Sequence, residues 1–178
     1  MNYTEIFGSL FSGFFQNEGI RSLPEEDVCT ELVMDLREPL PCEQPLPCPD
    51  GITFGIYRGP LGPLHEAVHR VDPDWVQYFN EEDSFFCAFH EDRIVAFCNI
   101  AEMGRSDGLR VSGPGCVGTI PEYRKQGIGL EMVRLATLAL REQGYDLSWI
   151  HYTHLESWYQ KLGYQTVLRW NRNGFLPV

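Results

Sequence analysis

The residues Arg124-Lys125-Gln126-Gly127-Ile128-Gly129 place two cations and two glycines immediately before an apolar, helix-like run. The first N–H groups of a helix lack intrahelical partners, and the helix dipole adds a potential that favours an anion there. Glycines at such a turn have no Cβ atom, so the backbone can approach phosphate oxygens closely. Val117–Ile120 reads as a strand that ends at Pro121 and leads into this turn. The pattern predicts a site for a phosphate or pyrophosphate group.

The segment differs from two common nucleotide-binding motifs. Met132 stands where the dinucleotide fingerprint G-x-G-x-x-G has its third glycine. No Gly-Lys-Ser/Thr follows, so the segment is not a P-loop either. A Gly-x-Gly pair also precedes many helices that bind nothing, and taken alone the segment leaves both interpretations open.

A second motif indicates a different kind of reaction. His65-Glu66-Ala67-Val68-His69 fits the H-E-x-x-H pattern of zinc peptidases, with two imidazoles one helical turn apart and a glutamate as general base. The pattern lacks the metzincin continuation, and Glu81 and Glu82 are weak stand-ins for a third ligand. Zinc hydrolysis is therefore the weakest of the functional alternatives, and no metal site is expected.

The residues on both sides of the glycine turn favour phosphate binding over the zinc site and over a turn that binds nothing. The string Val117-x-Thr119-x-Pro121-Glu-Tyr-Arg124-x-x-Gly127-x-Gly129 resembles the acetyl-CoA signature of the GNAT superfamily of N-acetyltransferases. Downstream, Tyr159-x-Lys161-x-Gly163-Tyr164 resembles a second family element, a tyrosine followed closely by Lys-x-Gly-Phe. Two elements in the family's order are more specific than either alone. The resemblance extends over roughly residues 51–170.

The resemblance implies acetyl-CoA as co-substrate and assigns residues to it. Backbone groups of the strand would hold the pantetheine arm, the turn would hold the pyrophosphate, and Tyr159 would protonate the departing CoA thiolate. An amphipathic helix with Trp158, Tyr159 and Leu162 on its apolar face is the alternative for this tyrosine. The cofactor-binding residues are Val117, Gly118, Thr119, Arg124, Lys125, Gln126, Gly127, Ile128 and Gly129.

Two parts of the family's site are not matched clearly. Tyr152 stands where the family often has an asparagine, which puts the usual amide contact to pantetheine in doubt. No general base is evident, although Glu102, Asp107, His151 and His154 are candidates. Each of these is more often a surface or satisfied polar residue.

Hydrophobic periodicity and turn residues predict the elements that position these residues. Glycine-rich residues 104–115 are expected to form a loop, and Gly144 to end the long helix. Only 175–178 remain for a last strand, so that edge is short or comes from another chain. The expected strands span 52–57, 84–89, 94–101, 113–120, 147–152 and 164–170, and the expected helices span 64–70, 72–79, 128–143 and 155–162.

The N-terminal segment differs in composition from the rest. An apolar stripe containing four phenylalanines predicts a helix over 3–17, docked on the domain's own core or on a second copy of the chain. Ser22-Leu-Pro-Glu25 reads as a capping box, with Val28, Leu32 and Leu36 on one face of a second helix. Five prolines in 39–49 predict a stiff extended connection.

Composition and charge narrow the functional class. The net charge is −11, and residues 1–50 hold ten acidic and two basic side chains. The chain lacks the basic patch of a nucleic-acid binder, the apolar run of a membrane span and a signal-peptide pattern, so a cytoplasmic protein is expected. The six cysteines show no disulfide or zinc-ribbon spacing. We expect Cys87, Cys98 and Cys116 to be buried free thiols, whereas Cys42 and Cys48 can be exposed.

Taken together, these features predict an α/β (α+β) GNAT-like domain, a mixed and mostly antiparallel sheet flanked by helices. Residues 1–49 would form an acidic helical extension with a proline-rich connection, and residues 50–178 the N-acetyltransferase domain. The predicted function is acetyl transfer from acetyl-CoA to a primary amine of a small molecule or peptide, by direct attack in a ternary complex. A CoA-binding regulatory module without turnover is the alternative. A homodimer is possible, and neither nucleic acid nor membrane is an expected partner.

Overall fold

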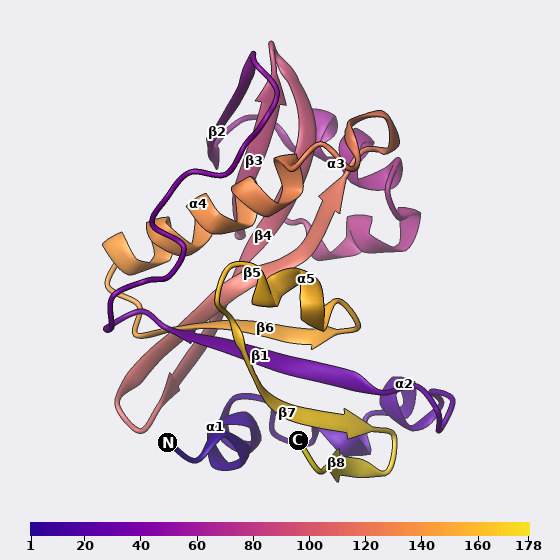
Figure 1. Cartoon of the computed structure of the whole chain (residues 1–178). Coiled ribbons are helices and arrows are strands. Elements are labelled where there is room, and N and C mark those ends of the chain that lie inside the picture. The colour runs from indigo at the N-terminus through magenta and orange to yellow at the C-terminus, as the bar shows by residue number, and fades with distance from the viewer. The chain divides into compact units, whose positions relative to one another are not determined.

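The computed structural model describes residues 1–178 (Figure 1). The chain forms two compact units, each considered by itself: unit 1 contains 1–40, 102–113 and 144–178, and unit 2 contains 41–101 and 114–143. Strands β4 (Arg93–Ser106) and β5 (Leu109–Thr119) contribute residues to both units. Neighbouring strands pair in the order β2-β3-β4-β5-β6-β1-β7-β8. This mixed, mostly antiparallel sheet with helices confirms the predicted fold class. The expected division at residues 49 and 50 stays a prediction.

Unit 1 is built on strand β1 (Cys29–Asp35), which pairs antiparallel with both β6 (Leu147–Thr153) and β7 (Gln165–Asn171). The first part of β5 pairs in parallel with β6 through Val111–Leu147 and Ser112–Ser148. The remaining elements are α1 (Tyr3–Leu10), η1 (Phe14–Gln16), α2 (Glu18–Arg21), α5 (Glu156–Gln160) and β8 (Gly174–Leu176). Its core comprises Ile6, Phe7, Val33, Val111, Leu147, Trp149 and Leu168.

Unit 2 contains two antiparallel strand pairs and the longest helix. Strand β2 (Ile52–Tyr57) pairs with β3 (Ser84–His90), which pairs with the first part of β4. Helix α4 (Ile128–Glu142) packs on β2 and β3. The remaining elements are α3 (Leu61–His69), η2 (Pro73–Tyr78) and η3 (Pro121–Tyr123). Gly144, with φ +78, follows α4 as expected. The expected order of strands and helices after residue 51 is confirmed.

The second N-terminal helix was predicted wrongly, because residues 29–35 form strand β1. Six of its seven residues are buried, since strands flank it on both edges and side chains cover both faces. A strand buried on both faces shows no alternation of polar and apolar residues. Its apolar positions therefore matched helical spacing by coincidence.

The predicted loop over 104–115 is also wrong. Strand β4 continues to Ser106 and β5 begins at Leu109, so only Asp107-Gly108 connects them. Both turn residues have positive φ, +51 and +80, as a two-residue hairpin turn of type I′ requires. An Asp-Gly pair is the sequence signal for this turn.

The N-terminal phenylalanines pack inside unit 1, which confirms the docking on the chain's own core. Helix α1 ends at Leu10, and a short 3-10 turn follows it, in place of one helix over 3–17. Phe7 is 2% exposed, and the Phe14 and Trp170 ring centroids lie 4.8 Å apart. The last strand, β8, is short, as expected, and pairs with β7 of the same chain.

The proline-rich connection lacks helix and strand, as predicted, and Figure 1 shows it passing along α4. Within unit 2, the Arg134 side chain donates to the carbonyl oxygens of Cys42 (3.1 Å) and Glu43 (3.2 Å). The Leu46 N–H donates to Glu131 Oε2 (3.0 Å). Because these bonds hold the segment on the helix, Cys42 is buried at 6% exposure, contrary to expectation. All six cysteines are free thiols.

Candidate functional site

The turn between β5 and α4 is held by main-chain and side-chain hydrogen bonds within unit 2. The Ile120 N–H donates to the Val95 carbonyl (3.0 Å), which fixes the end of β5. The 3-10 turn η3 follows, and Arg124 Nε reaches back to the Thr119 carbonyl (3.0 Å). Gln126 Nε2 donates to the Glu122 carbonyl (3.1 Å). The turn is thus preorganised, and Arg124 is one of the residues that shape it.

Gly127 begins α4 in a conformation that other residues rarely adopt. Its φ is +82, and no side chain caps the helix at this position. A Cβ atom on Gly127 would lie 2.6 Å from the Pro47 carbonyl oxygen. The first N–H groups of α4 lack intrahelical partners, as at every helix start. Residues 124–127 are exposed, so these groups form a cradle open to an anion.

The strand before the turn departs from regular geometry. Cys116 has φ +46, which is unusual for a residue other than glycine inside a strand. This reorients the backbone one residue before Val117, and such distortions are common beside functional sites. A Cβ atom on Gly118 would lie 2.4 Å from Phe97 Cζ, so the buried Phe97 ring packs directly on the Gly118 backbone.

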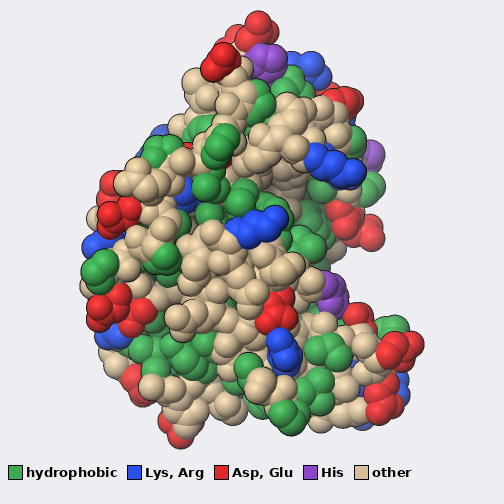
Figure 2. Space-filling view, viewed as in Figure 1, with side chains coloured by type: hydrophobic (Ala, Val, Ile, Leu, Met, Phe, Trp, Pro, Cys, Tyr) green, Lys and Arg blue, Asp and Glu red, His purple; other side chains and the backbone are tan.

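The cations at the turn are surrounded by mixed charge. Arg124 and Lys125 are exposed, and the neighbouring Glu122 forms an ion pair with Arg70. A backbone hydrogen bond and this arginine hold the pKa of Glu122 below its usual range. On the face seen in Figure 2, Lys and Arg side chains lie singly among Asp and Glu. The cations at the turn that suit a phosphate are Arg124 and Lys125.

Tyr159 lies in unit 1 on α5, which packs on β1 and β7. It is 5% exposed, and its ring contacts Trp158 (centroids 4.8 Å apart) and Tyr164 (6.1 Å). The expected apolar face of this helix is present, since Leu162 is buried as well. The predicted residues 117–129 all belong to unit 2, and Tyr159 belongs to unit 1.

Residues 81–166 match the family profile described as the acetyltransferase (GNAT) domain. The chain has a GNAT domain. This confirms the family that the motifs at Arg124–Gly129 and Tyr159–Tyr164 indicated. No curated protein matches the chain at a significant level.

Solved structures show the same GNAT fold. A glucosamine N-acetyltransferase region in a fungal multi-domain GH3 β-N-acetylglucosaminidase aligns with 82% of this chain (TM-score 0.65, 23% identity). A GCN5-related N-acetyltransferase from Kribbella flavida aligns with 79% (0.55, 20%). A tandem GNAT protein of the clavulanic acid biosynthesis pathway aligns with 81% (0.60, 15%). The aligned part spans 20%, 55% and 51% of these three chains.

The structure reveals a buried carboxylate that the sequence did not single out. Glu31 in β1 is 0% exposed and accepts from the indole N–H groups of Trp149 (2.6 Å) and Trp170 (2.7 Å). It also accepts from the Tyr152 N–H (3.1 Å) and His151 Nδ1 (2.9 Å). Tyr152, at the position where GNAT proteins often have an asparagine, has φ +55, and its N–H serves this network. The available sequence signal for this carboxylate is a glutamate within the largely apolar residues 28–36.

Three of the four candidate bases have other partners, and the fourth, Asp107, lies in a turn. Because a carboxylate only accepts, His151 must carry its proton on Nδ1, and its ring stacks on Phe11 (4.1 Å, 8°). Glu102 accepts from the Tyr145 hydroxyl, and Asp107 lies in the β4–β5 turn. His154 Nδ1 donates to the Val28 carbonyl (3.2 Å). No general base is assigned from these contacts.

His65 and His69 do not form a metal site. His65 Nε2 bonds to the Phe79 carbonyl (2.7 Å), so the imidazole has a structural partner. The one group of three potential ligand side chains in the chain is Asp27, Cys29 and His154, in the other unit. The H-E-x-x-H pattern therefore has no third ligand.

A cavity of about 600 Å³ lies in unit 2, away from the anion cradle. It lies between the C-terminal half of α4 and the ends of β2 and β3, and residues 58–61 and Glu81 border it. None of the predicted cofactor residues lines it. Parts of the segment between β2 and β3 therefore border free volume.

None of the helices has both the length and the apolar character needed to span a lipid bilayer.

Proposed function

We propose that this protein is an N-acetyltransferase that moves an acetyl group from acetyl-CoA to a primary amine. The anion cradle at residues 124–129 is the observation that carries the proposal, together with the family match that includes it. Acetyl-CoA supplies the acetyl thioester and presents a pyrophosphate. The uncapped start of α4, Gly127 at φ +82 and two exposed cations suit that group.

The residues of the strand and the turn have different roles in this proposal. Backbone groups of Val117, Gly118 and Thr119 hold the pantetheine arm, and the irregular backbone at Cys116 directs them. Arg124, Lys125, Gln126, Gly127, Ile128 and Gly129 hold the pyrophosphate. Arg124 acts partly through the turn, since its Nε is bonded to the Thr119 carbonyl.

Tyr159 is proposed as the general acid that donates its hydroxyl proton to the departing thiolate. A phenol is suited to this role because its ordinary pKa, about 10, is close to that of a thiol. The acceptor amine attacks directly, without a covalent enzyme intermediate. In unit 2, burial raises the pKa of the Cys116 thiol, next to Val117 in the chain, to about 11, so this thiol is protonated at neutral pH and a poor nucleophile.

Calorimetric titration of the protein with acetyl-CoA, with EDTA present throughout, tests the donor site. We expect micromolar binding that Gly127→Ala weakens at least about 10-fold, since the new Cβ meets the Pro47 carbonyl and strains the cradle. Gly62→Ala is the matched control, because a Cβ there meets nothing within 4 Å. Absence of binding to the folded protein would refute the proposal.

Turnover is tested by chromatographic detection of released CoA with a panel of amines. Glucosamine comes first, because the fungal structure named above is described as a glucosamine N-acetyltransferase region. Tyr159→Phe should lower turnover by about 100-fold while leaving acetyl-CoA affinity unchanged. Equal turnover in the variant would exclude Tyr159 as the acid. Binding without acetylation of any amine would favour the alternative, a CoA-binding regulatory module.

A further inference from the structure

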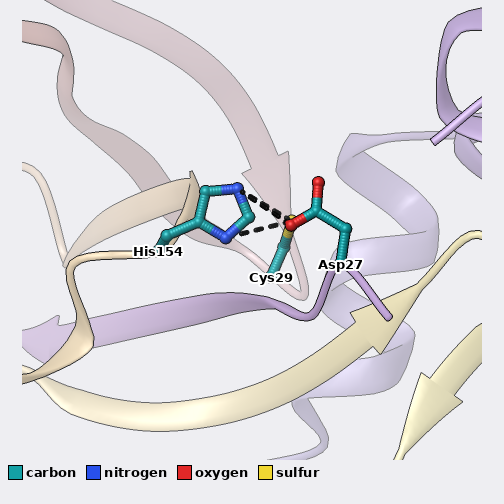
Figure 3. A group of neighbouring side chains, drawn as sticks. All are labelled: Asp27, Cys29 and His154. Atoms are coloured by element: carbon teal, nitrogen blue, oxygen red, sulfur yellow. Dashed lines mark hydrogen bonds and ion pairs between the residues drawn. The ribbon is translucent and has the colours of Figure 1, made fainter. Parts of the chain in front are cut away.

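Three side chains with metal-ligand chemistry meet in unit 1, and one of them, His154, is among the candidate bases named above. Figure 3 shows the Asp27 carboxylate and the Cys29 thiol on the same side of the His154 ring. Asp27 and Cys29 precede and begin β1, and His154 directly follows β6. The ligand atoms all lie within 4.8 Å of one another.

The spacing of these atoms is compatible with a shared ion, although the Cys29 thiol is also within sulfur hydrogen-bond distance of His154 Nε2 (3.7 Å) and Nδ1 (3.9 Å). His154 Nε2 is 3.6 Å from Asp27 Oδ1 and 3.7 Å from Cys29 Sγ. A nitrogen–oxygen hydrogen bond is about 2.7–3.2 Å long, so the first distance exceeds it. Ligands on a tetrahedral zinc ion, at about 2.0–2.3 Å from the metal, are about 3.3–3.6 Å apart. The two measured separations are close to those edges.

The histidine is already held in the tautomer that a metal needs. His154 Nδ1 lies 3.2 Å from the Val28 carbonyl, which can only accept, so Nδ1 carries the proton. The Nε2 lone pair is then available for an ion. A backbone carbonyl that orients a ligating imidazole through its other nitrogen is a usual outer-sphere contact of zinc sites.

We propose that Asp27, Cys29 and His154 bind a zinc ion, with solvent as the fourth ligand. One thiolate, one imidazole and one carboxylate form a donor set typical of zinc, whereas calcium and magnesium take oxygen ligands. The His154 side chain is 51% exposed and that of Asp27 is 35% exposed, so solvent can reach the open position. Cys29, at 0% exposure, supplies the buried side of the site.

The position of the site suggests what the ion does. Thr30 and Thr153 are register partners in the β1–β6 ladder, and the ligands lie just beyond this pair. An ion there would join the chain before β1 to the chain after β6. Binding should therefore raise the melting temperature of the protein, because it favours the folded state. This site is independent of the acetyl-CoA site, which is tested with EDTA present.

The test begins with full-length protein freed of metal by chelation and then titrated with zinc in competition with a chromophoric chelator. We expect one equivalent to bind, and cobalt in its place to give a thiolate-to-cobalt charge-transfer band. His154→Gln should weaken zinc binding about 100-fold or more, and Asp27→Asn should also weaken it. Both side chains are partly exposed, so these variants should fold.

Two control variants test whether a histidine or a cysteine elsewhere in the chain accounts for zinc binding. His69→Gln removes an exposed histidine of the H-E-x-x-H pattern, and Cys48→Ser removes a partly exposed thiol of unit 2. Neither should change zinc affinity or the cobalt band, whereas Cys29→Ser should abolish the band. The proposal is overturned if no band forms, if His154→Gln binds zinc normally, or if either control variant loses binding.

Discussion

Glu31 in unit 1 and Glu131 in unit 2 are both buried, at 0% and 5% exposure, but their surroundings differ. Glu131 is paired with the Arg134 guanidinium through two bonds of 2.6 Å, and Arg134 also binds the connection at Cys42 and Glu43. Glu31 has no arginine or lysine partner and accepts from two indoles, an imidazole and a main-chain N–H. The Glu131 carboxylate is thus stabilised by a positive charge, and the Glu31 carboxylate by N–H groups that point toward it.

The difference relates to what each carboxylate positions. Both strand ladders of β1 shift register beside Glu31: β1–β6 between Thr30 and Leu32, and β1–β7 between Glu31 and Leu32. The donors to Glu31 come from β6 and β7, so one side chain joins three strands where their pairing is irregular. Glu131 and Arg134 instead lie one turn apart on α4 and attach a loop to it. The first network shapes a sheet, and the second attaches a segment to a finished helix.

Glu31→Leu should give the largest effect. The substitution leaves two buried indole N–H groups, the part-buried His151 imidazole and the Tyr152 N–H without an acceptor, and each buried group costs about 1–3 kcal/mol. We expect the free energy of unfolding in urea to fall by about 4 kcal/mol or more. Glu31→Gln keeps one acceptor oxygen and should lose less. A loss below about 1 kcal/mol for Glu31→Leu would show that these bonds contribute little net stability.

Arg134→Met should have an intermediate effect on unfolding. It removes the charge that compensates the buried Glu131, and breaking such a pair from one side costs about 3–5 kcal/mol. The double variant Glu131→Leu/Arg134→Met removes both charges and should lose less than the single variant. The coupling is measured by a double-mutant cycle in urea. If the double variant instead loses the sum of the two single losses, the pair is not coupled.

The two regions also differ in how well the sequence predicts them. Helix α4 and its attached turn are local: the apolar period, Gly127 and Gly144 lie within one stretch, so both were predicted correctly. The Glu31 network joins residues 118 to 139 positions apart, which no window of sequence reveals. The positive φ values of Cys116 and Tyr152 also lack a local signal, because neither residue is a glycine or asparagine.

The wrong predictions for β1 and for the β4–β5 turn have different causes. The helix prediction fails at β1 because strands flank it on both sides, so its apolar residues do not alternate with polar ones. The β4–β5 turn carried a readable signal, Asp107-Gly108, which the surrounding glycines obscured. The ligand group at Cys29 depends on the β1–β6 pairing, so it could not be found while β1 was read as a helix.

Glu156 offers the smallest effect and a third way to balance a carboxylate, near the surface of unit 1. Its Oε1 accepts from Thr166 Oγ1 (2.5 Å) and Arg169 (2.9 Å), and the Thr166 bond is the first cause of a lowered pKa. A carboxyl whose pKa is lower folded than unfolded stabilises the fold above its unfolded pKa, and this stability is lost as the pH falls through the folded value. Glu156→Gln should therefore cost about 0.5–1 kcal/mol at pH 7 and progressively less below about pH 4.

Urea denaturation of both proteins at pH 7 and at pH 3 checks this, with the exposed Glu26→Gln as the matched control. Since solvent screens a carboxylate that is 27% exposed, its effect should remain well below those of Glu31 and Arg134. An equal loss at both pH values would mean that Glu156 acts through packing or through hydrogen bonds that its neutral form also makes. The order of the three effects would then reflect burial alone rather than the way each carboxylate is balanced.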